Sequence, residues 1–144
     1  MYVATILKAK GRSVVTAKPD ATLHDVAQKL AAKNIGAVVV VGTNGEVNGI
    51  ISERDIMRAI GDRGADALSA PVVEFMTRNV VCCSEHSPMD DLMETMTHGR
   101  FRHLPVVDED GGLVGIISIG DVVRHHIAEV ELEVSAMRNY LTAG

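Results

Sequence analysis

The sequence contains few aromatic residues and carries a net negative charge. Its 144 residues include no Trp, two Tyr and two Phe, so it offers few rings on which single-stranded nucleic acid could stack. The formal net charge of −5 opposes binding to a phosphate backbone. No apolar run reaches the roughly 18 residues that a membrane-spanning helix needs. We therefore expect neither a nucleic-acid partner nor a membrane partner.

The sequence also has little cysteine. Cys82 and Cys83 are adjacent and no third cysteine is present, so a bridge between them would be strained and a disulfide framework is excluded. The apolar stretch at residues 1–8 is too short for a secretion signal. We expect a cytoplasmic protein with two reduced thiols, and a redox switch made by the pair is the less favoured alternative.

An internal repeat organises the chain. When Val14 is aligned with Val80, residues 14–58 match residues 80–124 without a gap, and twelve of the 45 aligned positions are identical. We call this correspondence the repeat alignment. Unrelated sequences would share roughly one position in sixteen. The two segments are therefore copies of one unit.

Each copy predicts the same series of elements. Val14-Val15 and Val80-Val81 can start strands. After residues 22 and 88, apolar residues recur at helical spacing, which predicts a helix in each copy. Two apolar runs, 37–41 and 47–51 in the first copy and 104–107 and 113–117 in the second, flank a turn and precede another helix. A unit of about 45 residues buries too little apolar surface alone. We predict an α/β (α+β) fold in which two β-α-β-β-α repeats are related by a pseudo-twofold axis.

Composition suggests where the parts begin and end. We expect residues 1–62 to hold an N-terminal segment and the first repeat, residues 63–72 a linker, residues 73–127 the second repeat, and residues 128–144 a C-terminal helical extension. The stretch 61–67, which is rich in Gly and Asp, indicates the linker. Ile127, Val130, Val134 and Met137 form one apolar stripe on that extension. Such a stripe predicts a partner, most simply a second copy of the chain in a homodimer.

One motif occurs at the same place in both copies. It reads Gly-Ile-Ile-Ser-x-x-Asp at residues 49–55 and again at residues 115–121. One interpretation is a helix cap, because Ser-x-x-Asp satisfies free N–H groups of a first turn. The other is a nucleotide site, because a helix N-terminus favours phosphate and a carboxylate can accept hydrogen bonds from ribose hydroxyls. Basic residues stand near enough to offset the carboxylates, namely Arg54, Arg58, Arg100, Arg102, His103 and Arg124.

The tandem copies, their spacing and this motif resemble CBS domain pairs from about Thr5 to about Ile127. Residues 100–108, Arg-Phe-Arg-His-Leu-Pro-Val-Val-Asp, also resemble the family's segment before a strand. The resemblance implies a stand-alone pair, or Bateman module, with two clefts between the repeats. Such clefts bind adenine nucleotides, and we expect AMP or NAD(H) before ATP, ADP or S-adenosylmethionine, because one Arg-His pair suits few phosphates. The implied role is regulatory, without catalysis, and acts through an unknown protein effector.

The resemblance also assigns site residues. It places Asp55 and Asp121 on ribose, Ser52 and Ser118 near ribose or phosphate, and the strand-opening and pre-strand segments around adenine. The full expected set is Thr16, Ala17, Lys18, Gly36, Ala37, Val38, Ser52, Arg54, Asp55, Cys82, Cys83, Arg102, His103, Leu104, Pro105, Ser118, Gly120 and Asp121. The first repeat lacks the basic pair and the proline of residues 102–105, and Cys82 replaces Thr16, so we expect unequal pockets.

Three alternatives stay open. Adjacent His125 and His126 suggest a metal, but no familiar ligand spacing joins them to further ligands. Asp121 and His125 are spaced by one helical turn, which an ordinary exposed pair explains better than catalysis. Finally, the chain could be a structural or interaction protein with vestigial nucleotide pockets that dimerises through its C-terminal helix.

Overall fold

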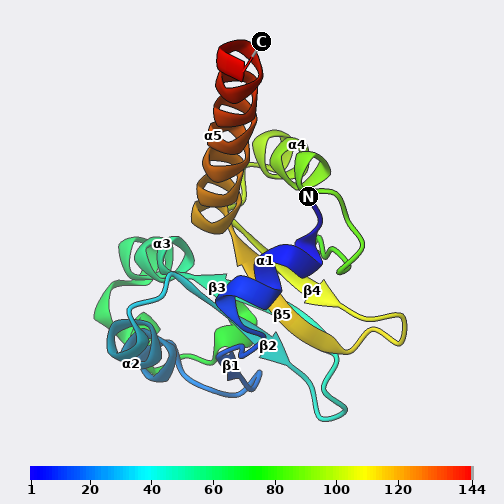
Figure 1. The fold of residues 1–144 in the computed structure, drawn as a ribbon. Coiled ribbons are helices and arrows are strands. Elements are labelled where there is room, and N and C mark those ends of the chain that lie inside the picture. The colour runs from blue at the N-terminus through cyan, green and yellow to red at the C-terminus, as the bar shows by residue number, and fades with distance from the viewer. Residues whose placement is uncertain (144) are drawn as a thin grey trace.

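A computed structural model describes residues 1–143 (Figure 1). The first half contains α1 (Val3–Lys10), β1 (Thr16–Ala17), α2 (Leu23–Lys33), β2 (Ala37–Val41), β3 (Val47–Ser52) and α3 (Glu53–Arg63). The second half contains the 3-10 helices η1 (Gly64–Ser69) and η2 (Val72–Glu74), then α4 (Met89–Gly99), β4 (His103–Val107), β5 (Leu113–Ser118) and α5 (Ile119–Ala143).

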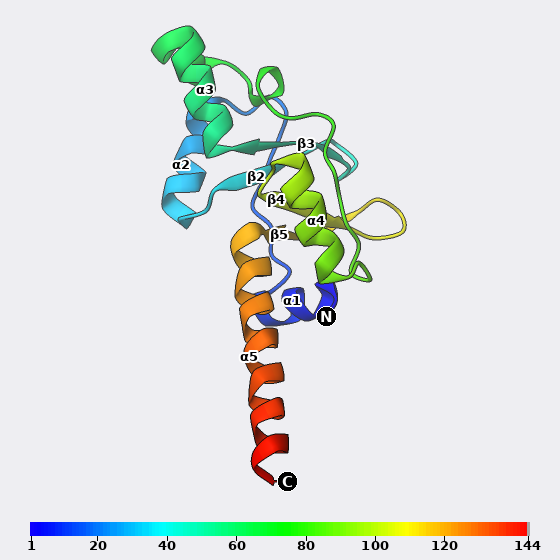
Figure 2. The same cartoon turned by 90° about the horizontal axis from the view of Figure 1, so that it is seen from above.

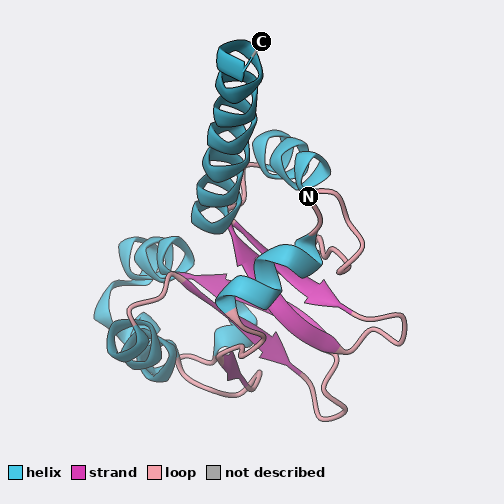
Figure 3. Cartoon of the chain, viewed as in Figure 1, coloured by secondary structure: helices cyan, strands magenta, loops and turns pink. Residues whose placement is uncertain are grey.

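The strands form two small sheets that lie next to each other, with helices packed around them (Figure 3). In the first sheet β1 pairs parallel with β2, and β2 pairs antiparallel with β3. In the second sheet β4 and β5 are antiparallel. The predicted strand starts were wrong: β1 begins at Thr16 rather than Val14, and Val80-Val81 form no strand. The counterpart of β1 is a single parallel bridge between Cys83 and Val106.

The duplication is visible in the backbone. Asn34 and Arg100, which are equivalent in the repeat alignment, end α2 and α4 in the left-handed conformation with φ of 53° and 56°. Gly45 and Gly111, which are also equivalent, take φ of 78° and 82° in the two hairpin turns, a conformation that glycine adopts without strain. Both hairpins also shift register at equivalent places. The two repeats therefore share their local geometry as well as their sequence.

Side-chain caps set the start of three helices. Thr22 and Asp25 form a reciprocal capping box at α2, and Ser52 and Asp55 form the same box at α3. At α5 the Ser118 hydroxyl accepts from the backbone N–H of Asp121 at 3.2 Å, while the Asp121 carboxylate accepts from the Ser118 N–H at 2.9 Å. The capping interpretation of the repeated motif is thus correct as a description of local structure.

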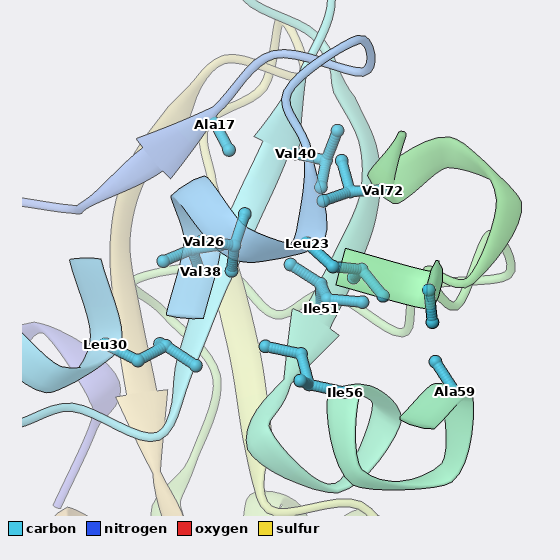
Figure 4. Packing of buried hydrophobic residues seen from close by; sticks show 11 residues of the cluster. Ala17, Leu23, Val26, Leu30, Val38, Val40, Ile51, Ile56, Ala59 and Val72 are labelled. Carbon is cyan, nitrogen blue, oxygen red and sulfur yellow. The ribbon is translucent and has the colours of Figure 1, made fainter. Parts of the chain in front are cut away.

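The first hydrophobic core is built mainly from the first repeat (Figure 4). It gathers Leu23, Val26, Val38, Ile51 and Ile56 from α2, β2, β3 and α3. It also contains the buried side chains of Ala67 and Val72. Those two residues come from the 63–72 segment, which we expected to be a linker. Most of this segment forms the 3-10 helix η1, which contacts α2 and α3 of the first repeat.

In the second hydrophobic core the roles of the two halves are exchanged. Met89, Leu92 and Leu104 of the second repeat pack around Ile6 and Leu7 of α1, all with at most 2% of their surface exposed. The N-terminal segment, grouped with the first repeat on sequence, therefore packs on the second. Each repeat is completed by the segment that precedes the other one, and this exchange holds the two halves together.

Helix α5 is the longest element and leaves the body of the protein (Figure 2). Its first turn is anchored by Val122, which is fully buried. The predicted apolar stripe lies on the helix as expected, with Ile127 52% and Met137 68% exposed. Within residues 1–143, no helix combines the length and the apolar character needed to cross a bilayer.

Candidate functional site

A cleft of about 270 Å³ opens between the two repeats. The N-terminal end of α3, where Ser52 and Asp55 lie, forms one side of it, and most of the remaining lining residues come from the second repeat and the segment before it. We call it the first cleft. It is lined by Gly36, Ile50, Ser52, Glu53, Arg54, Asp55, Arg58, Thr77, Asn79, Val80, Val81, Gly99, Arg100, Phe101, Arg102 and His103.

A second cleft, of about 330 Å³, lies at the pseudo-equivalent place by the N-terminal end of α5. It is lined by Lys10, Ser13, Val14, Val15, Asn34, Ile35, Gly36, Ala37, His103, Ile116 and Ser118. Most of these residues correspond to first-cleft residues in the repeat alignment. Both volumes lie near the lower end of the range for small-molecule sites, roughly 300–1,000 Å³.

The pairing of segments explains why the clefts lie between the repeats. The first cleft lies between the start of α3 in the first repeat and residues 77–81, which lead into the second repeat. The second cleft lies between the residues just before α5 in the second repeat and residues 10–15, which lead into the first repeat. Gly36 and His103 line both clefts and form the wall between them. A ligand in either cleft would therefore contact both repeats at once.

The carboxylate of Asp55 has one oxygen committed and one open. Its Oδ2 accepts from the backbone N–H of Ser52 at 2.8 Å and from the Ser52 hydroxyl at 3.0 Å. Oδ1 accepts no hydrogen bond among residues 1–143. Asp55 is half-buried and lines the first cleft. The side chain can cap α3 and still present an acceptor to a ligand hydroxyl.

Asp121 is more fully engaged. Its side chain is 9% exposed, and Oδ2 accepts from Lys10 Nζ at 2.6 Å as well as from Ser118. Oδ1 lies 3.5 Å from Arg124 Nη1. Lys10 also donates to the carbonyl of Ile116 at 2.9 Å. Burial alone would raise the pKa of Asp121, but the bonds from Lys10 and Ser118 together lower it.

Lys10 therefore lies between the second cleft and the acidic side chain. Lys10 lines the cleft, whereas Asp121 does not. Extended toward the N-terminus, the repeat alignment maps Lys10 to Met76, a partly buried residue packed on the first core. The first cleft consequently has no ammonium group at this position. The two carboxylates thus differ through a residue outside both motifs.

Arginine is concentrated at the first cleft. Arg54 and Arg58 come from α3, and Arg100 and Arg102 come from the segment before β4. The sequence showed that only the second repeat has the Arg102-His103 pair, but not which carboxylate the pair would lie near. In the structure Arg102 lines the cleft of Asp55, and His103 lines both clefts.

The structure places the predicted site residues in two groups. Those that line a cleft are Gly36, Ala37, Ser52, Arg54, Asp55, Arg102, His103 and Ser118. Those that line neither cleft are Thr16, Ala17, Lys18, Val38, Cys82, Cys83, Leu104, Pro105, Gly120 and Asp121. Ala17, Val38 and Leu104 direct their side chains into the cores. Ligand binding by any of them stays a prediction.

Several lining residues were not in the predicted set. Lys10, Ser13 and Asn34 belong to the second cleft, and Thr77 and Asn79 to the first. A signal for some of them was present, because the repeat alignment pairs Ser13 with Asn79 and Asn34 with Arg100. What the sequence does not show is that each leading segment crosses to the other repeat.

The cysteine pair and the histidines of α5 lie outside both clefts. Burial raises the pKa of Cys82, and burial together with the neighbouring Cys82 raises the pKa of Cys83 to about 12. Both thiols are therefore poor nucleophiles. His125 Nδ1 lies 2.9 Å from the backbone carbonyl of Asp121, not from its carboxylate. Across residues 1–143, no three His, Cys, Asp or Glu side chains gather as metal ligands would.

The chain contains two copies of one α/β unit. The segment before each copy packs on the other copy, and two clefts lie between them. This arrangement defines a tandem CBS pair. The CBS domain model matches residues 10–62 and 72–127, and the chain belongs to this family. This confirms the predicted family and the predicted fold of two β-α-β-β-α repeats.

The chain is similar to proteins of known structure and to relatives known from their sequences. The CBS-domain containing protein ATU1752 from Agrobacterium tumefaciens is 50% identical, with a TM-score of 0.84 over 88% of this chain and 99% of that one. CBS domain protein PAE2072 from Pyrobaculum aerophilum, complexed with AMP, is 28% identical, with a TM-score of 0.76 over 84% and 89%. The mitochondrial protein CBSX3 of Arabidopsis thaliana is 33% identical over 99% of this chain. The chain spans 66–72% of the length of CBSX3 and two other curated relatives.

Proposed function

We propose that this CBS pair is a regulatory module that binds an adenine nucleotide between its repeats and passes the resulting change of shape to a protein effector. The observation that carries the proposal is the first cleft, where an acceptor on Asp55 faces arginines from both repeats. The structure of the relative PAE2072 is of a complex with AMP, which supports the same ligand class here.

The chemistry of the first cleft suits a nucleoside phosphate. The free Oδ1 of Asp55 can accept from a ribose hydroxyl, as acidic residues do in dinucleotide sites. Arg100 and Arg102 stand on the opposite wall, where they can donate charge-assisted hydrogen bonds to a phosphate. A ligand that spans the two walls would fix the angle between the repeats, which is how occupancy becomes a signal.

The choice among adenine nucleotides depends on the number of phosphates. AMP and NAD(H) were preferred because a single Arg-His pair offers little charge. The first cleft is lined by four arginines, so ADP and ATP become stronger candidates than the sequence suggested. We keep AMP as the first ligand to test because its single phosphate makes the smallest demand on a cleft of about 270 Å³.

The proposal includes no catalytic step, and the cytoplasmic location stays a prediction from the sequence. The competing hypothesis is a structural protein whose pockets no longer bind. It is favoured by the second cleft, where Lys10 already donates a hydrogen bond to the carboxylate of Asp121. It predicts that no adenine nucleotide raises the melting temperature.

The test is isothermal titration calorimetry with AMP on the unmodified protein and on Asp55→Ala. We expect AMP to bind the unmodified chain and to raise its melting temperature, because a ligand of the folded state stabilises it. Asp55→Ala should weaken AMP binding by roughly tenfold or more, since it removes a hydrogen bond made by a charged group.

Asp25→Ala is the matched control. Asp25 occupies the same place in the capping box of α2 as Asp55 does in that of α3, but it does not line the first cleft. Both substitutions should lower the free energy of unfolding by about 1 kcal/mol through the lost cap, and only Asp55→Ala should change AMP affinity. Equal AMP affinity in both variants would remove Asp55 from the site.

A further inference from the structure

Helix α5 carries a regular apolar stripe along its whole length. The spacing between successive apolar residues alternates between four and three, which is the heptad pattern of a coiled coil. The residues and their exposed fractions are Val123 42%, Ile127 52%, Val130 42%, Val134 43%, Met137 68% and Leu141 72%. This extends the predicted stripe by one residue at each end.

The rest of the described chain does not cover this stripe. The body contacts a different face of α5, where Val122 is fully buried and Glu129 lies 3.9 Å from the N-terminal amine of Met1. Val122 and Glu129 are one heptad apart and so share one heptad position outside the stripe. Six exposed apolar side chains in a line are costly in water and require a partner surface.

We propose that α5 pairs with α5 of a second copy of this chain in a parallel, two-stranded coiled coil. Ile127, Val134 and Leu141 take the a positions and Val123, Val130 and Met137 the d positions. Two of the three a residues are β-branched, which is the a-position preference of a two-stranded pair, while the d positions hold Val, Val and Met rather than the Leu of that pattern. Sedimentation equilibrium must therefore distinguish a dimer from a trimer. The proposal is independent of nucleotide binding.

The charges beside the stripe select the parallel orientation. Residues at g of one helix face residues at e of the next heptad on the other helix in a parallel pair. Glu133 at g would face Arg138 of the partner subunit, and His126 at g would face Glu131 of the partner subunit. Glu131, Glu133 and Arg138 are all exposed, so they are available for such pairs.

An antiparallel pair would place like charges together. There, e positions face e positions, so in a pair centred on Glu131 this residue would meet its own copy. Arg124 would also approach Arg138 of the partner subunit. A membrane surface is disfavoured as well, because the exposed Glu131 and Glu133 beside the stripe would repel anionic lipid.

The first experiment measures dimerisation by sedimentation equilibrium. Val134→Asp at the centre of the stripe should leave a monomer with an unchanged melting temperature at low protein concentration, because Val134 makes no part of either core. Leu132→Ala is the control, since Leu132 is 70% exposed but lies off the stripe. A monomeric unmodified chain, or a dimer that survives Val134→Asp, would overturn the proposal.

The second experiment tests the charge pairs and the orientation. Glu133→Lys and Arg138→Glu should each weaken the homodimer by about threefold or more. A mixture of the two variants should form heterodimers in preference to either homodimer, because both interhelical pairs become attractive. Val134→Cys should give a disulfide between the introduced thiols on mild oxidation, since equivalent a residues meet along the whole seam in a parallel pair. A dimer that stays uncrosslinked would overturn the parallel orientation.

Discussion

The two clefts have the same frame and different chemistry. Each is closed by a Ser-x-x-Asp helix start, and Asp55 and Asp121 make equivalent capping bonds. Asp55 keeps an oxygen open toward a cleft that four arginines line. Asp121 is covered by Lys10 and is 9% exposed.

The comparison shows where a duplicated fold can diverge. The cap positions are tied to helix formation, so they stay alike in both repeats. The leading segments, which cross to the other repeat, carry Lys10 on one side and Met76 on the other. The first cleft therefore has an open carboxylate oxygen beside four arginines, whereas at the second cleft Lys10 lies between the cleft and Asp121.

The largest expected effect comes from removing that internal cation. Lys10→Met introduces the residue type that the repeat alignment pairs with Lys10, namely that of Met76. It leaves the partly buried Asp121 without its 2.6 Å partner, so the free energy of unfolding should fall by about 1.5–3 kcal/mol at neutral pH. Urea denaturation checks this, with Lys8→Met as a control because Lys8 is an exposed lysine on the same helix.

The effect of Lys10→Met should also depend on pH. The pKa of Asp121 is lowered in the folded protein, so the stability that its charge provides is present above the usual Asp value of about 3.9 and is lost as the pH falls through the lower folded pKa. The difference between Lys10→Met and the unmodified protein should shrink in that acidic window. A constant difference at every pH would argue that Lys10 acts by packing alone.

A smaller effect is expected from Arg102→Ala at the first cleft. Arg102 is exposed, so the loss of AMP affinity should be about 1.5 kcal/mol, or roughly tenfold, at the low end for a charged hydrogen bond. Adenosine has no phosphate and should lose little. Both ligands should be titrated against Arg102→Ala and against the control Arg124→Ala, because Arg124 lies 3.5 Å from Asp121 and does not line the first cleft. Equal losses for AMP and adenosine would contradict a phosphate role for Arg102.

Local features of the fold could be predicted from the sequence. The repeat, the starts of α2 and α3, and the exposed stripe of α5 all follow from spacing and from residues such as Thr22 and Ser52. Short-range capping and periodicity determine these features. The prediction that Val80 and Val81 start the first strand of the second repeat was wrong, because these residues line a cleft instead of pairing with β4.

The assembly of the site could be predicted only in part. Ser52, Asp55 and Ser118 were identified because one motif holds them, but the partners of each motif come from the other repeat. The repeat alignment does not reveal that α1 packs on the second core, so Lys10 was missed, and it does not show that Arg102 lines the cleft of Asp55. The packing of each leading segment on the other repeat is a long-range feature, and no pattern in the local sequence indicates it.

The smallest expected effect concerns His103, which both clefts share. Burial lowers the pKa of His103, and Lys10 and Arg102 lower it further, while Glu53 and Asp121 act in the opposite direction. Because the fold favours the neutral ring, stability should fall as the pH drops from about 7.5 through the usual His value of about 6.5. His103→Gln should flatten this slope by a few tenths of a kcal/mol, whereas His98→Gln, which changes an exposed side chain of α4, should not. AMP bound in either cleft should oppose the slope, because phosphate stabilises the protonated ring; a slope that AMP leaves unchanged would mean that His103 faces no phosphate and serves both clefts only as a wall.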